Sequence, residues 1–312
     1  MSPSPQYSPY KKPFFGRRFL WLLIFILIPV IALLNNLGPS EAFLVDPVDG
    51  EVRTEFDVAQ LPVRQDEFAG LRVTWVDLPD SGQVRVTVLS DRQPLEVSPA
   101  PGDTHLEVTA RHGLMVSTLT MPLTTGALQD GTRFLSQWLP ANTAQTRLVV
   151  TGDLTPERVE EIASRVASAD APGAALQISR PAAVTRLTSP APGTEGYLHF
   201  ALAMELLSER LDGYNARLTW SHRTRDSEAL LNTSLDASQR RVPDEQDFLA
   251  LREDWVDAHT DQRRSVDYIH GQLLTLTAFD VTPDHLTGRA ERLANLDYET
   301  FRSLWEQWFE RS

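Results

Sequence analysis

Residues 147–166 read RLVVTGDLTPERVEEIASRV and predict a strand, a tight turn and a helix in direct succession. The apolar run 148–150 is typical of a buried strand, and Gly152-Asp153 supplies the turn. Thr155 is a good helix cap, and Pro156 suits the first helical position. The helix carries apolar residues at i, i+3, i+4 and i+7, which form one face: Val159, Ile162, Ala163 and Val166. We therefore expect one strand of a sheet with a helix packed against it.

The chain before this unit reads as β structure. Segments that alternate apolar and polar residues, or are rich in β-forming residues, predict strands at 71–78, 83–90, 105–110 and 114–121. A Pro-Asp-Ser-Gly turn joins the first two as a hairpin, and His112-Gly113 lies between the last two. A short helix is expected over 126–138. Together these segments form an N-terminal α+β domain over 44–170.

The chain after this unit begins with a linker and continues as a second domain. Residues 171–194 are rich in Ala, Pro and Gly, which predicts a linker with one short strand near 175–187. The domain over 195–312 is mostly helical, with elements expected at 196–211 (helix), 216–225 and 228–237 (strands), and 244–259, 262–279, 283–294 and 297–310 (helices). The predicted fold class is α+β, with two small lobes of sheet plus helices.

Near its N-terminus the chain carries a membrane signal. Residues 19–34, FLWLLIFILIPVIALL, are sixteen apolar residues without a charge. As a helix they cover about 24 Å, and the residues that follow can extend this towards the roughly 30 Å of a bilayer core. Four basic residues precede the run and none follows before Arg53, so the positive-inside rule places the disordered, basic tail 1–18 in the cytoplasm. We expect one transmembrane helix over 19–37, with a signal peptide cleaved near 40–42 as the alternative.

Both readings send the body of the chain across a bacterial-type inner (cytoplasmic) membrane, into the periplasm. Residues 41–312 carry 25 basic and 42 acidic side chains, a net charge of −17. A body this acidic repels nucleic acid and anionic lipid headgroups, which excludes both as partners of the body. The chain has no cysteine, and this excludes disulfides, thiolate catalysis and cysteine metal sites.

No residue pattern predicts a catalytic, cofactor-binding or metal-binding site. None of the 7 histidines stands four residues from another, which is the spacing of a zinc-binding helix. No lysine follows Lys12, and its absence excludes a Walker phosphate loop, a Ser-x-x-Lys site and a Schiff-base lysine. The acidic clusters at 244–247 and 253–257 are expected to be a solvated helix face, with a hydrolytic carboxylate site as the alternative.

The C-terminal helix carries an aromatic stripe. Large apolar residues recur at helical spacing at Phe301, Leu304, Trp305, Trp308 and Phe309. Burial against a neighbouring helix is the main expectation for this stripe. The alternative is a docking face, on which Trp305 and Trp308 would contact a partner.

In their order, these elements resemble the domains of the pitrilysin/insulinase family of zinc peptidases. The stretch 147–166 is similar to the strand, Gly-Asp turn and helix that close a domain in that family. FAGLRVTWVDLPDSGQVRVTVLS (68–90) resembles the family's first hairpin, and residues 201–236 resemble the helix and strand pair of its second domain. The helices over 280–309 are similar to that domain's helical end.

The chain also departs from the family at the residues that carry catalysis. The zinc-binding signature His-x-x-Glu-His is absent, and residues 92–103 leave room only for a Pro-rich loop where its helix would lie. The family holds substrate with an Arg and a Tyr of the second domain. At the comparable place this chain offers Arg210, Arg217 and Trp220, which are candidate contacts for substrate or partner.

What the resemblance implies is a degenerate, non-catalytic member of the family, without a cofactor. Together with the apolar run 19–34, it suggests a membrane-anchored pseudopeptidase. Such a protein would act by binding, with an active zinc peptidase subunit or an envelope protein as its partner and residues 19–34 as its membrane contact. Two alternatives remain: a hydrolase with an unrecognised carboxylate site, and a purely structural envelope protein.

Overall fold

A computed structural model describes residues 52–96, 99–140, 145–211, 216–261, 263–283, 285 and 288–310. The predicted tail 1–18 and transmembrane helix 19–37 lie outside these residues. Within the described part of the chain, no helix is long and apolar enough to cross a membrane.

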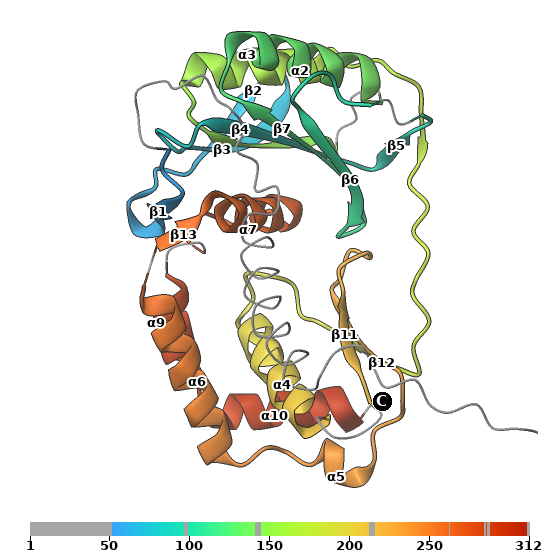
Figure 1. Ribbon diagram of the computed structural model, residues 1–312. Helices are drawn as coiled ribbons and strands as arrows, with labels where there is room; N and C mark the ends of the chain where they lie inside the picture. The colour runs from blue at the N-terminus through green and yellow to red at the C-terminus, as the bar shows by residue number, and fades with distance from the viewer. Residues whose placement is uncertain are drawn as a thin grey trace, which may run out of the picture. The chain divides into compact units, whose positions relative to one another are not determined.

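A six-stranded sheet organises the first half of the chain (Figure 1). In spatial order its strands are β2 (Arg64–Phe68), β3 (Leu71–Asp77), β8 (Arg147–Gly152), β4 (Gln83–Ser90), β7 (Leu114–Pro122) and β6 (His105–Arg111). β3 and β8 are parallel, and the other neighbours are antiparallel. The four strands predicted before residue 122 and the strand of the stretch 147–166 are therefore confirmed.

The predicted hairpin of β3 and β4 is wrong, because β8 lies between these two strands. β8 suits a central position because its apolar residues are all buried and both of its edges are paired. Where β8 ends, a Cβ atom on Gly152 would lie 2.2 Å from the carbonyl oxygen of Gln83. This close approach, together with a φ of 140°, requires glycine there. The hairpin forms one strand earlier, between β2 and β3, with Ala69 and Gly70 in its turn.

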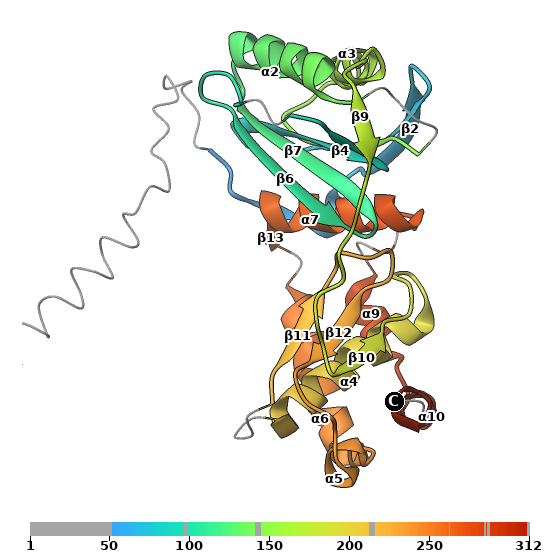
Figure 2. The same cartoon turned by 90° about the vertical axis from the view of Figure 1, so that its right-hand side faces the viewer.

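Two helices cover one face of this sheet, α2 (Thr125–Trp138) and α3 (Pro156–Ala167), as Figure 2 shows. The capped helix predicted from the opening stretch is confirmed, since the Thr155 side chain accepts a hydrogen bond from the backbone N–H of Arg158. Its four predicted core residues are all buried against the sheet: Val159, Ile162, Ala163 and Val166. The pattern of apolar residues therefore identified both the helix and the face that it buries.

The helix α7 (Val266–Phe279) covers the opposite face of the same sheet (Figures 1 and 2). The buried side chain of His270 fixes its position: Nε2 lies 2.6 Å from Oγ1 of Thr87, and Nδ1 lies 2.9 Å from Oγ1 of Thr151. Burial, and after it the positive charge of Arg85, lowers the pKa of His270 to about 3, so the ring is neutral at pH 7. A helix from the predicted C-terminal domain thus completes the core of the first sheet.

The second half of the chain builds a three-stranded antiparallel sheet, in the order β10 (Thr185–Thr188), β12 (Glu228–Leu231) and β11 (Leu218–Ser221). The helices that follow or precede these strands are α4 (Glu195–Leu211), α5 (Ala237–Arg240), α6 (Glu245–Thr260), α9 (Arg289–Ala294) and α10 (Tyr298–Glu310). Their common core combines leucine with aromatic side chains, which include Phe200, Phe248 and Phe301. β10 lies within the predicted linker 171–194, where it adds an edge to this sheet.

Two short strand pairs join segments that are distant in sequence. β1 (Glu55–Asp57) pairs with β13 (Arg263–Ser265), and β5 (Arg92–Pro94) pairs with β9 (Gly173–Ala175). A 3-10 turn over Val58–Gln60 follows β1. The α+β class is confirmed, and residues from 50 onward form one compact unit.

Candidate functional site

The tip of the β6–β7 hairpin meets the β11–β12 hairpin of the small sheet. His112 and Gly113 form the turn between β6 and β7, with left-handed φ values of 54° and 75°. The backbone N–H of His112 donates to the carbonyl oxygen of His222 at 2.6 Å, and that of Gly113 donates to Arg223 at 3.1 Å. Two backbone hydrogen bonds therefore connect the two sheets at this point.

The side chain of His112 is buried at this junction and is only 5% exposed. Its ring lies edge-on to Phe279 at 4.8 Å and to His222 at 5.6 Å between centroids. Both ring nitrogens are buried without a hydrogen-bond partner among the described residues. Burial, followed by the positive charges of Arg111 and His222, lowers the pKa of His112 to about 3. A neutral ring with this pKa is a poor general acid or base at pH 7.

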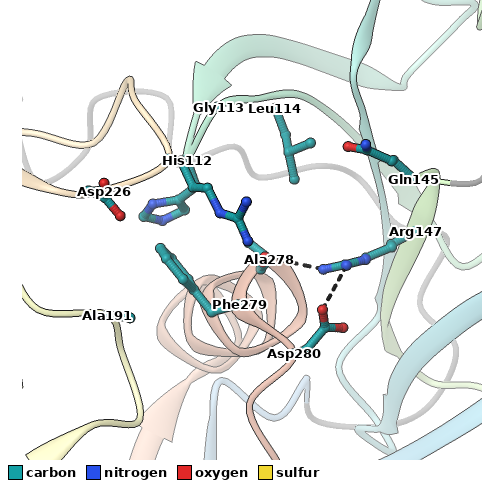
Figure 3. Close-up of a pocket in the computed structure, with 11 residues that line it drawn as sticks. His112, Gly113, Leu114, Gln145, Arg147, Ala191, Asp226, Ala278, Phe279 and Asp280 are labelled. Atoms are coloured by element: carbon teal, nitrogen blue, oxygen red, sulfur yellow. Dashed lines mark hydrogen bonds and ion pairs between the residues drawn. The ribbon is translucent and has the colours of Figure 1, made fainter.

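Beside His112 lies a cavity of about 620 Å³, which we call the Arg147 cavity (Figure 3). Nη1 of Arg147 donates to the carbonyl oxygens of Thr277 at 2.6 Å and Ala278 at 3.2 Å. Nη2 of Arg147 lies 2.8 Å from Oδ2 of Asp280, the dashed ion pair in Figure 3. Arg72 forms a second ion pair with the same carboxylate. These bonds satisfy the carbonyl groups at the end of α7, so the arginine of this cavity serves the structure.

The described residues contain no set of side chains that could bind zinc. Within the described ranges, no group of three His, Cys, Asp or Glu side chains could hold a metal ion. Between β4 and β6, the described residues form the strand β5 and turns, and include no helix. The described residues of 92–103 thus form a short strand and turns where a Pro-rich loop was expected.

The carboxylates give no support to the hydrolase alternative. All of the acidic residues in the two clusters on and beside α6 are exposed: Asp244, Glu245, Asp247, Glu253, Asp254 and Asp257. The carboxyls of Glu157, Asp236 and Asp297 have lowered pKa values. The main causes are hydrogen bonds from a backbone N–H to Glu157 and Asp297, and from the Ser238 hydroxyl to Asp236. A general acid needs a raised pKa, so these three groups do not suit that role.

Trp305 lies in the core of the second lobe and is 0% exposed. Its Nε1 donates to the carbonyl oxygen of Arg240 at 2.8 Å, and the Arg210 guanidinium lies 5.5 Å from the ring centroid of Trp305. Arg210 also donates to the carbonyl oxygen of Arg241. Trp305 is thus buried, which was the main expectation for the aromatic stripe, and the guanidinium of Arg210 lies over its ring.

Two of the remaining predicted contacts meet on one core residue. The rings of Trp220 and Trp308 lie edge-on to Phe200, at 5.6 Å and 5.0 Å, and both are half-buried. Trp220 also stacks on His222 at 6.0 Å. Arg217 is exposed and precedes β11, where its backbone N–H donates to Oδ1 of Asn232 at 2.7 Å. Trp220 therefore lies between the core residue Phe200 and His222 of the hairpin junction. The backbone hydrogen bond of Arg217 is to a different residue, Asn232.

The comparisons with known proteins identify the fold. No protein-family model matches the sequence, and no curated protein matches it. The structure is similar to the inactive domain of an M16 peptidase from Pseudomonas fluorescens, with a TM-score of 0.57 and 11% identity over 79% of this chain and 95% of that one.

Two further solved structures belong to one protease. The first half of the periplasmic protease PqqL from Escherichia coli has a TM-score of 0.54 and 10% identity, over 80% of this chain and 89% of that half. For the longer structure of PqqL the TM-score is 0.50, with 11% identity over 79% of this chain and 46% of PqqL. At these identities the likeness shows the fold alone. The predicted resemblance to the pitrilysin family is confirmed at this level.

Proposed function

We propose that this chain, which has the fold of an M16 peptidase domain, acts by binding and not by catalysis. One observation carries the proposal: the frame of the fold is present, but the sequence contains no His-x-x-Glu-His. A metallopeptidase of this kind activates water on a zinc ion that the two histidines hold. The buried, neutral His112 and the exposed acids of α6 do not replace that set.

The partner that we propose is an active M16-type peptidase chain. This chain matches about half of PqqL, whose first half has been solved separately with the same fold. In this proposal the residues of this chain take the place of one of the two parts, and a second chain supplies the catalytic part. The apolar run 19–34 supports a membrane anchor that would hold this pair on the extracytoplasmic side of the inner membrane.

The first test addresses catalysis. The purified full-length chain, in detergent, is incubated with labelled casein and with short quenched peptides, and its zinc content is measured in the same sample. We expect no cleavage above the buffer blank and no stoichiometric zinc. Cleavage that a zinc chelator abolishes would overturn the proposal.

The second test addresses the partner. The chain is co-expressed with an M16-type peptidase of the same organism that contains His-x-x-Glu-His, and the two are purified through a tag on this chain. We expect this chain and the peptidase to co-elute in equal amounts. A version of this chain that begins after residue 40, and so lacks the apolar run 19–34, should give the same result. If this chain elutes without the peptidase, pairing is excluded, and an envelope protein as partner or a purely structural role becomes the hypothesis to test.

A further inference from the structure

A second cavity, of about 470 Å³, lies where the end of β6 meets α4, α7 and α9. We call it the arginine cavity, because its wall includes Arg111 from β6 together with Arg289 and Arg292 from α9. Among the described residues that line it, none is Asp or Glu. It is thus a basic site in a body whose net charge is −17.

Two of the three arginines of this cavity, Arg111 and Arg289, have a buried Nε atom without a hydrogen-bond partner in the described part of the chain. Neither side chain takes part in an ion pair within that part of the chain. Burial lowers the pKa of Arg111, and this effect exceeds the raising effects of Tyr197 and Glu107. Arg292 differs, since its Nη2 donates to the carbonyl oxygen of His285 at 2.5 Å.

The positive charges of the two arginines of α9, Arg289 and Arg292, also repel each other. The pKa of Arg292 is lowered first by burial and then by the positive charge of Arg289. Both side chains are half-buried, and Glu291 offsets only part of this effect on Arg292. A bound anion would relieve both the repulsion and the missing hydrogen bonds of Arg111 and Arg289. The site is therefore electrostatically complementary to a negatively charged group.

The rest of the wall indicates what else such a ligand carries. Leu198, Leu276 and Leu296 give the cavity an apolar side, and Gln272 and Asn295 offer amide groups. A small inorganic anion would leave the apolar side without a partner, whereas a carboxylate attached to an apolar group would use both. The planar guanidinium pairs with a carboxylate through two parallel hydrogen bonds.

We infer that the arginine cavity binds the carboxylate of a small molecule with an apolar substituent, such as the C-terminal residue of a peptide. The inference goes beyond the proposed function and does not depend on a peptidase partner. The carboxylate lies between Arg111 and Arg289, and the apolar group lies against the leucines.

The test is a titration of the full-length chain, in detergent, with N-acetyl-leucyl-leucine and with the C-terminal amide of the same compound. We expect the acid to bind. The affinity for the amide should be lower by at least about tenfold, because the amide cannot form the charged pair. Arg289→Gln should weaken binding of the acid by about tenfold or more, and Arg289→Lys should weaken it less, because it keeps the charge.

The matched control is Arg158→Gln, an exposed arginine of α3 on the other face of the first sheet. This variant should bind the acid as the natural chain does, and circular dichroism checks that all variants are folded. Equal binding of acid and amide would overturn the inference, and so would equal affinities of Arg289→Gln and Arg158→Gln. Inorganic phosphate that binds as tightly as the acid would overturn the apolar part of the assignment.

Discussion

The Arg147 cavity and the arginine cavity use the same residue type in opposite ways. In the first, Arg147 donates to two backbone carbonyl groups and pairs with Asp280. In the second, Arg111 and Arg289 have buried nitrogens without a partner among the described residues. An unsatisfied buried donor costs about 1–3 kcal/mol, so folding does not benefit from these two side chains as it does from Arg147. The difference separates an arginine that stabilises the fold from arginines that are available to a ligand.

The largest expected effect on stability comes from a fall in pH. It acts through two buried histidines, His112 on the wall of the Arg147 cavity and His270 between α7 and the first sheet. The pKa values of His112 and His270 are lowered to about 3, so between about pH 3 and pH 6.5 the unfolded chain binds more protons than the folded one. Stability is complete above pH 6.5 and falls as the pH drops. From pH 7 to pH 5 each histidine should cost about 2 kcal/mol, and the pair about 4 kcal/mol.

Urea unfolding at the two pH values measures this loss. His112→Asn tolerates the left-handed turn and removes one titrating group, so its loss should be smaller by about 2 kcal/mol. An identical pH dependence in the natural chain and in this variant would contradict the assignment of His112.

Removal of the paired arginine should have the next largest effect. Arg147→Ala removes the Nη1 hydrogen bonds to the carbonyl groups of Thr277 and Ala278. It also removes the inner of the two ion pairs of the Asp280 carboxylate and leaves the exposed one to Arg72. We expect the free energy of unfolding to fall by about 3 kcal/mol, because several charge-assisted hydrogen bonds are lost together. A loss below about 1 kcal/mol in urea unfolding would show that this cavity does not depend on its arginine.

A smaller effect is expected at the outer partner of the same carboxylate. The side chain of Arg72 is 60% exposed, against 23% for Arg147. Solvent screens the exposed ion pair, so Arg72→Ala should cost at most about 1 kcal/mol. Comparison of the two variants in the same unfolding experiment separates the buried bonds from the exposed ion pair.

The smallest effect on stability is expected in the arginine cavity. Arg289→Gln removes a charge that repels Arg292 and has no ion-pair partner in the described chain. The free energy of unfolding should fall by less than about 0.5 kcal/mol, or it should rise because a repulsion has been removed. A loss as large as that of Arg147→Ala would remove the distinction between the two cavities and give Arg289 a structural role.

Prediction from the sequence succeeded where local patterns decide the outcome. The helix after Thr155 was predicted from its cap and its four apolar residues, and all four are buried. It failed for the pairing of β3 with β4, because alternation along two strands says nothing about a third strand that inserts between them. The charged cavities were not predicted either, since Arg111 and Arg289 share no motif and stand far apart in the chain.

By itself, the sequence determined most of the longer strands and helices, the acidic body and the absence of His-x-x-Glu-His, because these depend on residue types and short spacings. It also indicated burial for Trp305, since an aromatic residue at helical spacing removes the most apolar area when it faces a neighbour. Only the tertiary structure decided that β8 enters between β3 and β4, that α7 covers the first sheet, and that three arginines share one cavity. Each of these depends on contacts between distant segments, which are selected by burial and pairing over the whole chain and not by any local pattern.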